Sequence, residues 1–281
     1  MKHVIALLAL ASACALAPAK AETTRCTEIT SLPATITTQG AYCLHKDLST
    51  NVNSGAAIEI KTNNVTLDCN GWKVGGLSAG ISTDARGIYA SNRQNITIRN
   101  CGVRGFRTGI YIGGGAGHLI EDNRVDNSTG VGIQLSGDAI TMRRNRIIDT
   151  GGKPGSVSSY GIYLSGTGTS ISDNQVVNVT VTGDSSGNGY VYGIVFTGTG
   201  HEIARNQFIN LIPAGTGKAY GTYGGGGTTV SLRDNTAMNP TPTSGTGIDG
   251  GDSVSQCRGN MSRGFTTALA YCTDVSGNAG T

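Results

Sequence analysis

The chain has 281 residues and a formal net charge of +3 at pH 7. Two of its 21 basic residues, Lys2 and Lys20, lie in a segment that we expect to be removed, which leaves 19 basic against 18 acidic residues. This balance gives no support to a nucleic acid or an anionic membrane surface as a partner.

The N-terminus has the three parts of a secretory signal. A basic start at residues 1–3 is followed by an apolar run at residues 4–17 and by the motif Ala-Lys-Ala at residues 19–21. We therefore predict a signal peptide over residues 1–21 and a protein that is secreted or periplasmic after cleavage.

An alternative is a lipoprotein acylated at Cys14. The preceding residues 11–13 lack the Leu that usually stands three residues before such a cysteine, so this alternative has less support. No later stretch is apolar enough to span a bilayer.

Two short motifs then alternate along the chain: an apolar strand that ends near Asn, and a Gly followed by Ile. The Gly-Ile steps begin at Gly87, Gly109, Gly132, Gly161, Gly193 and Gly247, with Gly221-Thr222 in the remaining place. The Asn steps are Asn123, Asn145, Asn174, Asn206, Asn235 and Asn260. Repeats of roughly 20–50 residues predict a solenoid, in which each unit buries its apolar face against its neighbours.

The spacing of the repeats places their insertions at one corner. Successive isoleucines from Ile88 to Ile194 are 22, 23, 29 and 32 residues apart, and the Asn spacing lengthens with them. The extra residues lie after the Asn strand and before the next Gly, along one edge that we expect to be a binding edge. We expect the Asn residues to occupy left-handed corners and to bond to one another along the axis.

Export leaves six cysteines, an even number that predicts disulfides in an oxidising compartment. Cys69 and Cys101 occupy matching segments of successive coils, which stack about 4.8 Å apart, so we expect them to pair. A metal site is the alternative, but no close cysteine pairs of the zinc type occur. The remaining cysteines then staple the two ends, as Cys26–Cys43 and Cys257–Cys272.

Three segments at the start of the repeats share a distinctive form: NVTLDCNG at residues 64–71, NITIRNC at 95–101 and RGFRTGI at 104–110. With these segments the chain resembles the secreted right-handed parallel β-helix proteins of the pectate-lyase-like superfamily. The resemblance implies an all-β, single-stranded right-handed parallel β-helix of about eight coils over residues 63–281, after an N-terminal cap over residues 22–62. Lyases, hydrolases, epimerases and phage tailspikes share that scaffold, so the resemblance does not transfer a reaction.

Tyrosine recurs at two positions of the repeat. Two residues past each repeat glycine stand Tyr89, Tyr111, Gln134, Tyr163, Val195, Tyr223 and Asp249, which alternation turns outward. One residue before it stand Arg86, Thr108, Val131, Tyr160, Tyr192, Tyr220 and Thr246, whose facing stays open because a Gly corner can break the alternation.

An exposed strip of tyrosines suits a linear polysaccharide, because each ring offers an apolar face and a hydroxyl to a sugar. The alternative is that the aromatic ladders only stabilise neighbouring strands. We predict polysaccharide-binding residues in this tyrosine strip, namely Arg86, Tyr89, Tyr111, Tyr160, Tyr163, Tyr192, Tyr220 and Tyr223.

Catalysis on the same face is an alternative function. Asp249 and Asp252 are the best local pair of carboxyl groups for a hydrolase, although solvated acids of a turn explain them better. Arg86 beside Tyr89 and Tyr111 would suit a uronate lyase or epimerase, which needs a base and a cation. The active-site motifs of such enzymes are not recognisable in the sequence.

We predict neither a metal nor another cofactor. His118 and His201 occupy comparable positions but are too far apart along the solenoid to share a metal ion, and the chain lacks the clustered His or Met of copper-handling proteins. The favoured function is an exported protein that holds an extended polysaccharide. The second alternative is a structural or adhesive rod, and the sequence does not set the oligomeric state.

Overall fold

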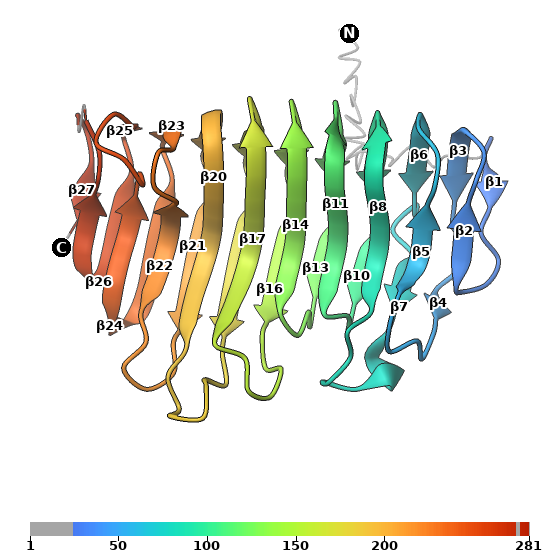
Figure 1. Ribbon diagram of the computed structural model, residues 1–281, viewed down its shortest axis with the longest axis horizontal. Coiled ribbons are helices and arrows are strands. Elements are labelled where there is room, and N and C mark those ends of the chain that lie inside the picture. The colour runs from blue at the N-terminus through green and yellow to red at the C-terminus, as the bar shows by residue number, and fades with distance from the viewer. Residues whose placement is uncertain (1–24, 274–275, 281) are drawn as a thin grey trace, which may run out of the picture.

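The computed structural model describes residues 25–273 and 276–280. The expected signal peptide at residues 1–21 and Cys14 therefore lie outside the described residues. The described chain winds into a rod whose strands lie side by side from one end to the other (Figure 1). Its one described helix is the short 3-10 helix η1 (Leu77–Ala79).

Each coil contributes one strand to each of three parallel sheets. The first sheet consists of β2 (Ala34–Ile36), β5 (Ala56–Ile60), β8 (Arg86–Gln94), β11 (Thr108–Ala116), β14 (Val131–Asp138), β17 (Ser158–Thr167), β20 (Tyr190–Ala204), β22 (Ala219–Gly224), β24 (Thr236–Asp249) and β26 (Met261–Ala270).

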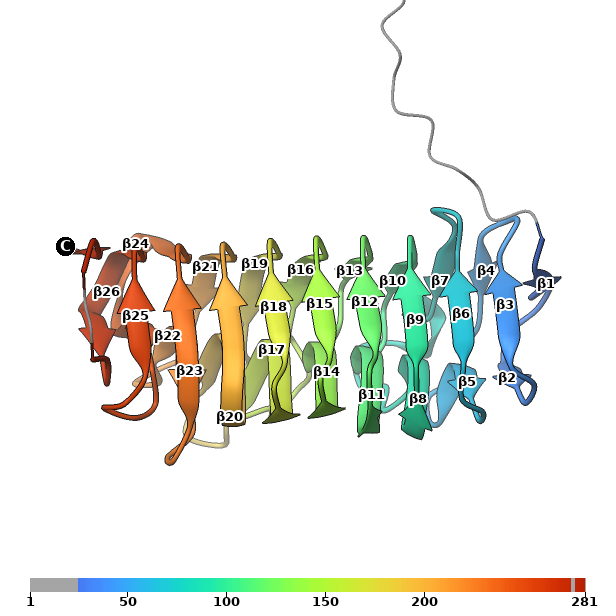
Figure 2. The ribbon, with the colours of Figure 1, turned by 90° about the horizontal axis from the view of Figure 1, so that it is seen from above.

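The second sheet follows the first along every coil and forms the row of strands in Figure 2. It consists of β1 (Thr27–Glu28), β3 (Gly40–Cys43), β6 (Val65–Asp68), β9 (Ile96–Arg99), β12 (Leu119–Glu121), β15 (Thr141–Arg143), β18 (Ser170–Ser172), the second half of β20, β23 (Thr229–Arg233) and β25 (Gln256–Arg258).

The third sheet closes the coil. It consists of β4 (Leu48–Ser49), β7 (Lys73–Gly75), β10 (Gly102–Arg104), β13 (Arg124–Asp126), β16 (Arg146–Thr150), β19 (Gln175–Thr180), β21 (Gln207–Ile212), the first parts of β24 and β26, and β27 (Ala279–Gly280). The predicted all-β parallel β-helix is thus confirmed. Eight strands of the first sheet, β8 to β26, lie beyond residue 63, and β2 and β5 add two more within residues 22–62.

The inward ladders of the first sheet are in register and buried. Ile88 pairs with Ile110, Ile110 with Ile133 and Ile133 with Ile162, and each of these side chains is fully buried. Together with the inward residues of the other two sheets they form one continuous hydrophobic core along the rod. Burial of these ladders is the main stabilising term of a solenoid, because no single coil has a core of its own.

The repeat glycines are required by close packing rather than by an unusual backbone angle. A Cβ atom on Gly161 would lie 2.3 Å from a methyl carbon of Val176 in the third sheet and 2.7 Å from the carbonyl oxygen of Gly193 in the next coil. Since carbon atoms pack no closer than about 3.5 Å, only glycine fits there. The Gly-Ile step therefore marks where the first and third sheets approach each other.

The Asn ladder is structural, as expected, but its residues do not occupy the left-handed corners. The residue before each Asn has the positive φ, for example 59° at Asp173 and 56° at Arg205. The Asn side chains turn into the rod instead and bond to the next coil. The ladder is selected for its buried amides, not for the backbone angle.

The insertions gather on one edge, at the bottom of Figure 1. They are the loops 76–85, 151–157, 181–189 and 213–218, each of which connects the third sheet to the first. At the next coil, β24 continues through the corner instead of forming a loop.

The three expected disulfides are all present, which confirms the predicted pairing: Cys26–Cys43, Cys69–Cys101 and Cys257–Cys272. The first and third join residues near the two ends of the rod, where a solenoid lacks a neighbouring coil. Within the described ranges, no helix has the length and apolar character needed to cross a bilayer.

Candidate functional site

Both tyrosine rows of the repeat lie on the outward face of the first sheet. In the row after the glycine, Tyr89 pairs with Tyr111, and two strands further on Tyr163 pairs with Val195. In the row before the glycine, Tyr160 packs edge-on against Tyr163, with ring centroids 5.6 Å apart. The two rows therefore form one surface, which settles the facing that the sequence left open.

The two rows share a face because of the backbone at the repeat glycine. Gly161 and Ile162 are both buried, so the strand does not alternate at this step and the residues on either side emerge on the same face. From Ile162 onward the side chains again point alternately inward and outward. The glycine that permits close packing against the third sheet thus also doubles the width of the tyrosine strip.

A cluster of five tyrosines forms the C-terminal part of the strip: Tyr160, Tyr163, Tyr192, Tyr220 and Tyr223. Tyr192 is stacked between Tyr160 and Tyr220, with centroid distances of 5.1 and 5.2 Å and interplanar angles of 12° and 9°. Tyr223 packs edge-on against both Tyr192 and Tyr220, at 5.5 and 4.9 Å. Both faces of the Tyr192 ring are consequently occupied by protein.

Burial raises the pKa of two tyrosines in this cluster. It raises the pKa of the Tyr192 phenol well above its ordinary value, and the neighbouring tyrosines raise it further. The pKa of Tyr220 is also raised, mainly by burial. These phenols stay neutral at physiological pH and keep a hydroxyl that can donate or accept a hydrogen bond.

A second cluster forms the N-terminal part of the strip. The Arg86 guanidinium carbon lies 4.9 Å from the centre of the Tyr89 ring and 4.8 Å from that of Tyr111, and the two ring centres are 5.2 Å apart. Within residues 25–273 and 276–280, no carboxylate forms an ion pair with Arg86. Cation–π contacts orient the guanidinium but leave its N–H groups able to bind an anion.

The strand β14 separates the two clusters. Its outward residues are Val131 and Gln134, and Gln134 lies in register between Tyr111 and Tyr163. Two strand spacings, or about 9.6 Å, separate the backbones of these two tyrosines. The half-buried Gln134 lies between them and offers an amide with both donors and an acceptor.

An ion pair joins two insertion loops over the short corners of β11 and β14. The ammonium of Lys153, in the loop 151–157, lies 2.6 Å from a carboxylate oxygen of Asp84, and Arg107 approaches the same oxygen at 3.6 Å. The hydrogen bond from Lys153 lowers the pKa of Asp84. The sequence carries no signal for this contact, since its partners lie 69 residues apart in different loops.

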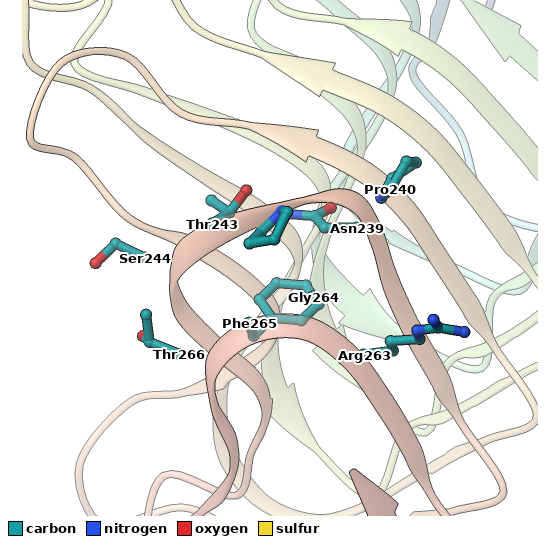
Figure 3. Close-up of a pocket in the computed structure, with 9 residues that line it drawn as sticks. Asn239, Pro240, Thr243, Ser244, Arg263, Gly264, Phe265 and Thr266 are labelled. Carbon is teal, nitrogen blue, oxygen red and sulfur yellow. The ribbon is translucent and has the colours of Figure 1, made fainter. Parts of the chain in front are cut away.

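Hollows line the insertion edge beside the strip. One of about 210 Å³ lies in the same region as the ion pair, between Leu77 and Ile81 on one side and Gly151 on the other. Two others, of about 560 and 400 Å³, lie on either side of residues 239–244. Figure 3 shows the larger of these two, with Phe265 at its centre and Arg263 on the opposite side from Ser244.

The two acids expected to support catalysis have different environments. Asp249 is only 4% exposed, and burial raises its pKa to about 6, although the N–H of Gly251 bonds to it at 2.8 Å. It is in electrostatic contact with Tyr220. Asp252 is half-buried and bonds weakly within its own turn, to Ser253 and Val254.

The two histidines that share a position in the repeat are buried structural groups. Nδ1 of His118 accepts the N–H of Ile96 at 3.3 Å, and Nδ1 of His201 accepts the N–H of Thr169 at the same distance. The other ring nitrogen of each contacts a carbonyl oxygen four residues earlier. Burial lowers both pKa values.

One group of potential metal ligands occurs in the part of the chain that the structure describes, namely Cys26, Cys43 and His45. The two cysteines form a disulfide, and Nε2 of His45 lies 3.3 Å from Cys43 Sγ. A disulfide sulfur is a poor metal ligand because metals bind the thiolate.

A family model described as the right handed beta helix region matches residues 36–208. The match confirms the expected handedness and the resemblance noted in the sequence. The comparison with curated proteins gives no match.

Three solved structures are similar to this chain. The Dettilon tailspike protein has 17% identity and a TM-score of 0.50 over 89% of this chain and 57% of its own. DFA-IIIase from Arthrobacter chlorophenolicus A6 in complex with GF2 has 12% identity and a TM-score of 0.48, over 83% of this chain and 63% of its own. The A-module of a mannuronan C-5 epimerase from Azotobacter vinelandii has 15% identity and a TM-score of 0.40, over 86% of this chain and 80% of its own. The chain thus spans less than two thirds of the tailspike and of DFA-IIIase, and at these identities the likeness concerns the fold alone.

Proposed function

This chain belongs to the right-handed β-helix family, and on that premise we propose that it binds an extended polysaccharide along the tyrosine strip. The observation that carries the proposal is the extent of the strip. Seven tyrosines and Arg86 share one face over the six consecutive strands from β8 to β22. A site about 24 Å long and without a single deep pocket suits a linear polymer better than a small molecule.

The stacking within the strip decides how a sugar would be held. Tyr192 has no free ring face, so it offers a sugar its edge and its hydroxyl. The interval over Gln134 is different, because Tyr111 and Tyr163 are two strands apart with an amide between them. We assign the principal sugar subsite to this interval, where aromatic contact and hydrogen bonding are combined.

The insertion edge supports the same path. Its hollows lie beside the strip, and the larger two are lined by hydroxyl groups such as those of Thr243 and Ser244. Sugar hydroxyls pair well with such groups. The three disulfides are consistent with a protein that acts outside the cytoplasm, secreted or in the periplasm.

The test is a glycan array with a Tyr111→Ala/Tyr163→Ala double variant. Trp72→Ala is the matched control, because Trp72 is an exposed aromatic residue outside the strip, 39% exposed. We expect the double variant to lose glycan binding while it unfolds as a single cooperative transition, and the control to bind normally. Equal binding by the double variant and the wild type would overturn the assignment of the strip.

A second candidate function is cleavage of the bound polysaccharide, and the observation that favours it is Asp249. A buried carboxyl with a pKa near 6 suits a general acid, and this one lies at the Tyr220 end of the strip. New reducing ends, or ultraviolet absorbance from unsaturated uronates, would establish an enzyme. Loss of these products in the Asp249→Asn variant would identify Asp249 as the general acid.

The stacked rings also fit a rod whose ladders serve only stability. No glycan binding and no turnover across a broad polysaccharide panel would favour that function over both of the others.

A further inference from the structure

The N-terminal part of the tyrosine strip has an excess of positive charge that the fold does not neutralise. Arg107 and Lys153 share the single carboxylate of Asp84. Arg86 begins β8 two residues after Asp84 and forms no ion pair with any residue in the described ranges. Two cations thus contact one acid, and Arg86 is one residue from this group along both neighbouring strands, since it pairs with Thr108 and Arg107 N–H donates to the carbonyl oxygen of Ala85. The three cations and the one acid leave an excess of two positive charges at this end of the strip.

Most arginines on the rest of the rod are paired. Arg99 bonds to Asp68, Arg143 to Glu121 and Arg205 to Asp173, each across neighbouring coils. Such ladders are the ordinary way in which a solenoid neutralises stacked charges. The cations Arg86, Arg107 and Lys153 depart from this pattern, because Asp84 is their one acidic partner among the described residues, and they lie near the face where a ligand would bind.

Arg86 is held in position without an acid. Its guanidinium is stacked on Tyr89 and Tyr111, so little conformational entropy remains to be lost when it binds an anion. The planar fork of N–H donors matches the two oxygens of a carboxylate or of a sulfate. The loop that carries Asp84 also lines a hollow with Leu77 and Ile81, which offer apolar contact to a sugar ring. The carboxylate of Asp149 lines the same hollow and accepts the amide of Asn178.

We propose that Arg86, Arg107 and Lys153 form an anion site that takes the carboxylate or sulfate group of an acidic glycan. The site rests on the proposed function, because it selects among polysaccharides that lie along the same strip. Asp84 is the internal competitor: its bridge to Lys153 occupies the site when no ligand is bound, and a ligand anion replaces it. The Asp84 side chain is 59% accessible, so water and a ligand anion can compete for its bridge to Lys153, whose own side chain is 25% accessible.

Binding should be measured with two pairs of polymers that differ only in charge. The first pair is polygalacturonate and its methyl ester, which tests the carboxylate; the second is dextran sulfate and dextran, which tests the sulfate. We expect tighter binding of a charged polymer than of its neutral partner, with an affinity that falls as salt is added. Equal binding of both members in both pairs would overturn the proposal.

Three variants locate the site. Arg86→Gln should weaken binding of the preferred charged polymer by at least about tenfold, the effect of losing a charge-assisted hydrogen bond, and weaken binding of its neutral partner much less. Asp84→Asn should tighten binding of the charged polymer, because the competing carboxylate is removed. Arg146→Gln is the matched control, since Arg146 is an exposed arginine on the third sheet, and it should bind like the wild type.

The outcomes separate this proposal from the proposed function. Binding of neutral glycans alone, abolished by Tyr111→Ala/Tyr163→Ala, would leave the strip in place and refute the anion site. A preference for charge that persists in Arg86→Gln but is lost in Arg146→Gln would place the anion elsewhere and also refute it. Thermal unfolding of Arg86→Gln and of the wild type should be compared, and we expect equal melting temperatures. Arg86→Lys, which keeps the charge but not the planar fork of donors, should retain part of the preference for the charged polymer.

Discussion

The side-chain oxygen of Asn174 accepts two hydrogen bonds from Asn145, one from its backbone N–H and one from its amide, both at 2.9 Å. The same pair of hydrogen bonds joins the Asn residues of successive coils, and this Asn ladder ends at Asn278. Each amide also donates to backbone carbonyl oxygens, so every Asn completes the turn of one coil and joins it to the next.

Asn174→Ala should therefore destabilise the protein strongly. Asn174 is 1% exposed, and its loss leaves the buried backbone N–H of Asn145 without an acceptor. It also removes the amide that donates to the carbonyl oxygens of Met142 and Ser172. We expect the free energy of unfolding in urea to fall by about 3 kcal/mol or more. The control is Gln175→Ala, one residue further along, whose amide bonds to Gln207 on the exposed surface and whose loss should cost about 1 kcal/mol or less. Equal losses would show that burial of the ladder is unimportant.

Gly161→Ala tests the close approach of the first and third sheets. The added methyl group would meet Val176 at 2.3 Å and the Gly193 carbonyl oxygen at 2.7 Å, so neighbouring coils must separate. We expect a loss of about 1–3 kcal/mol, measured by chemical denaturation. Gly226→Ala is the control, because a Cβ atom there meets nothing within 4 Å, and it should change stability by less than about 0.5 kcal/mol.

Asp249→Asn should stabilise the protein at neutral pH. The folded pKa of Asp249, about 6, lies above its ordinary value of 3.8, so the folded state holds a proton that the unfolded state releases. Its contribution to stability is thus complete below about pH 4 and is lost as pH rises to about 6. At pH 7.5 the variant should gain about 2–3 kcal/mol, and near pH 4 it should match the wild type. An equal gain at both pH values would contradict the raised pKa; Asp252→Asn serves as control.

The buried histidines predict the opposite pH dependence. Burial desolvates both rings and thereby lowers the pKa of His118 and of His201, although hydrogen bonds to backbone carbonyl oxygens oppose the shift. The unfolded state then takes up protons first, so stability is complete above about pH 6.5 and falls as the pH decreases below that value. A His118→Gln/His201→Gln variant should be less stable at pH 7.5 but should lose less stability between pH 7.5 and pH 5. Parallel curves for the two proteins would refute this assignment.

Tyr192→Leu separates stability from binding. Tyr192 is stacked on both faces, so its replacement removes two aromatic contacts, and we expect a loss of about 1–3 kcal/mol. Glycan binding should weaken less than in Tyr111→Ala/Tyr163→Ala, because Tyr192 offers the ligand only an edge. Glycan binding and chemical denaturation should be measured on the same preparations, so that the two effects of Tyr192→Leu can be compared directly. A loss of binding as large as that of the double variant would count against the subsite over Gln134.

Much of the architecture was predictable because the chain repeats. In a solenoid, equal positions in successive repeats become neighbours, so the sequence spacing of Ile88 and Ile110 already specifies their contact. The same logic placed Cys69 beside Cys101. The left-handed position was predicted wrongly at Asn, since the amide ladder and the backbone angle both suit asparagine, and only the structure separates them.

The spacing of the repeats was enough to predict the parallel β-helix, its inward ladders, its disulfides and the edge that carries the insertions, because periodicity converts directly into stacking. Three features became visible only in the folded chain: both tyrosine rows share one face, both faces of the Tyr192 ring are occupied, and Lys153 reaches Asp84. These features depend on how the chain bends at a glycine and on how side chains and loops pack across several coils. Such packing follows no period, so it cannot be deduced from spacing along the chain.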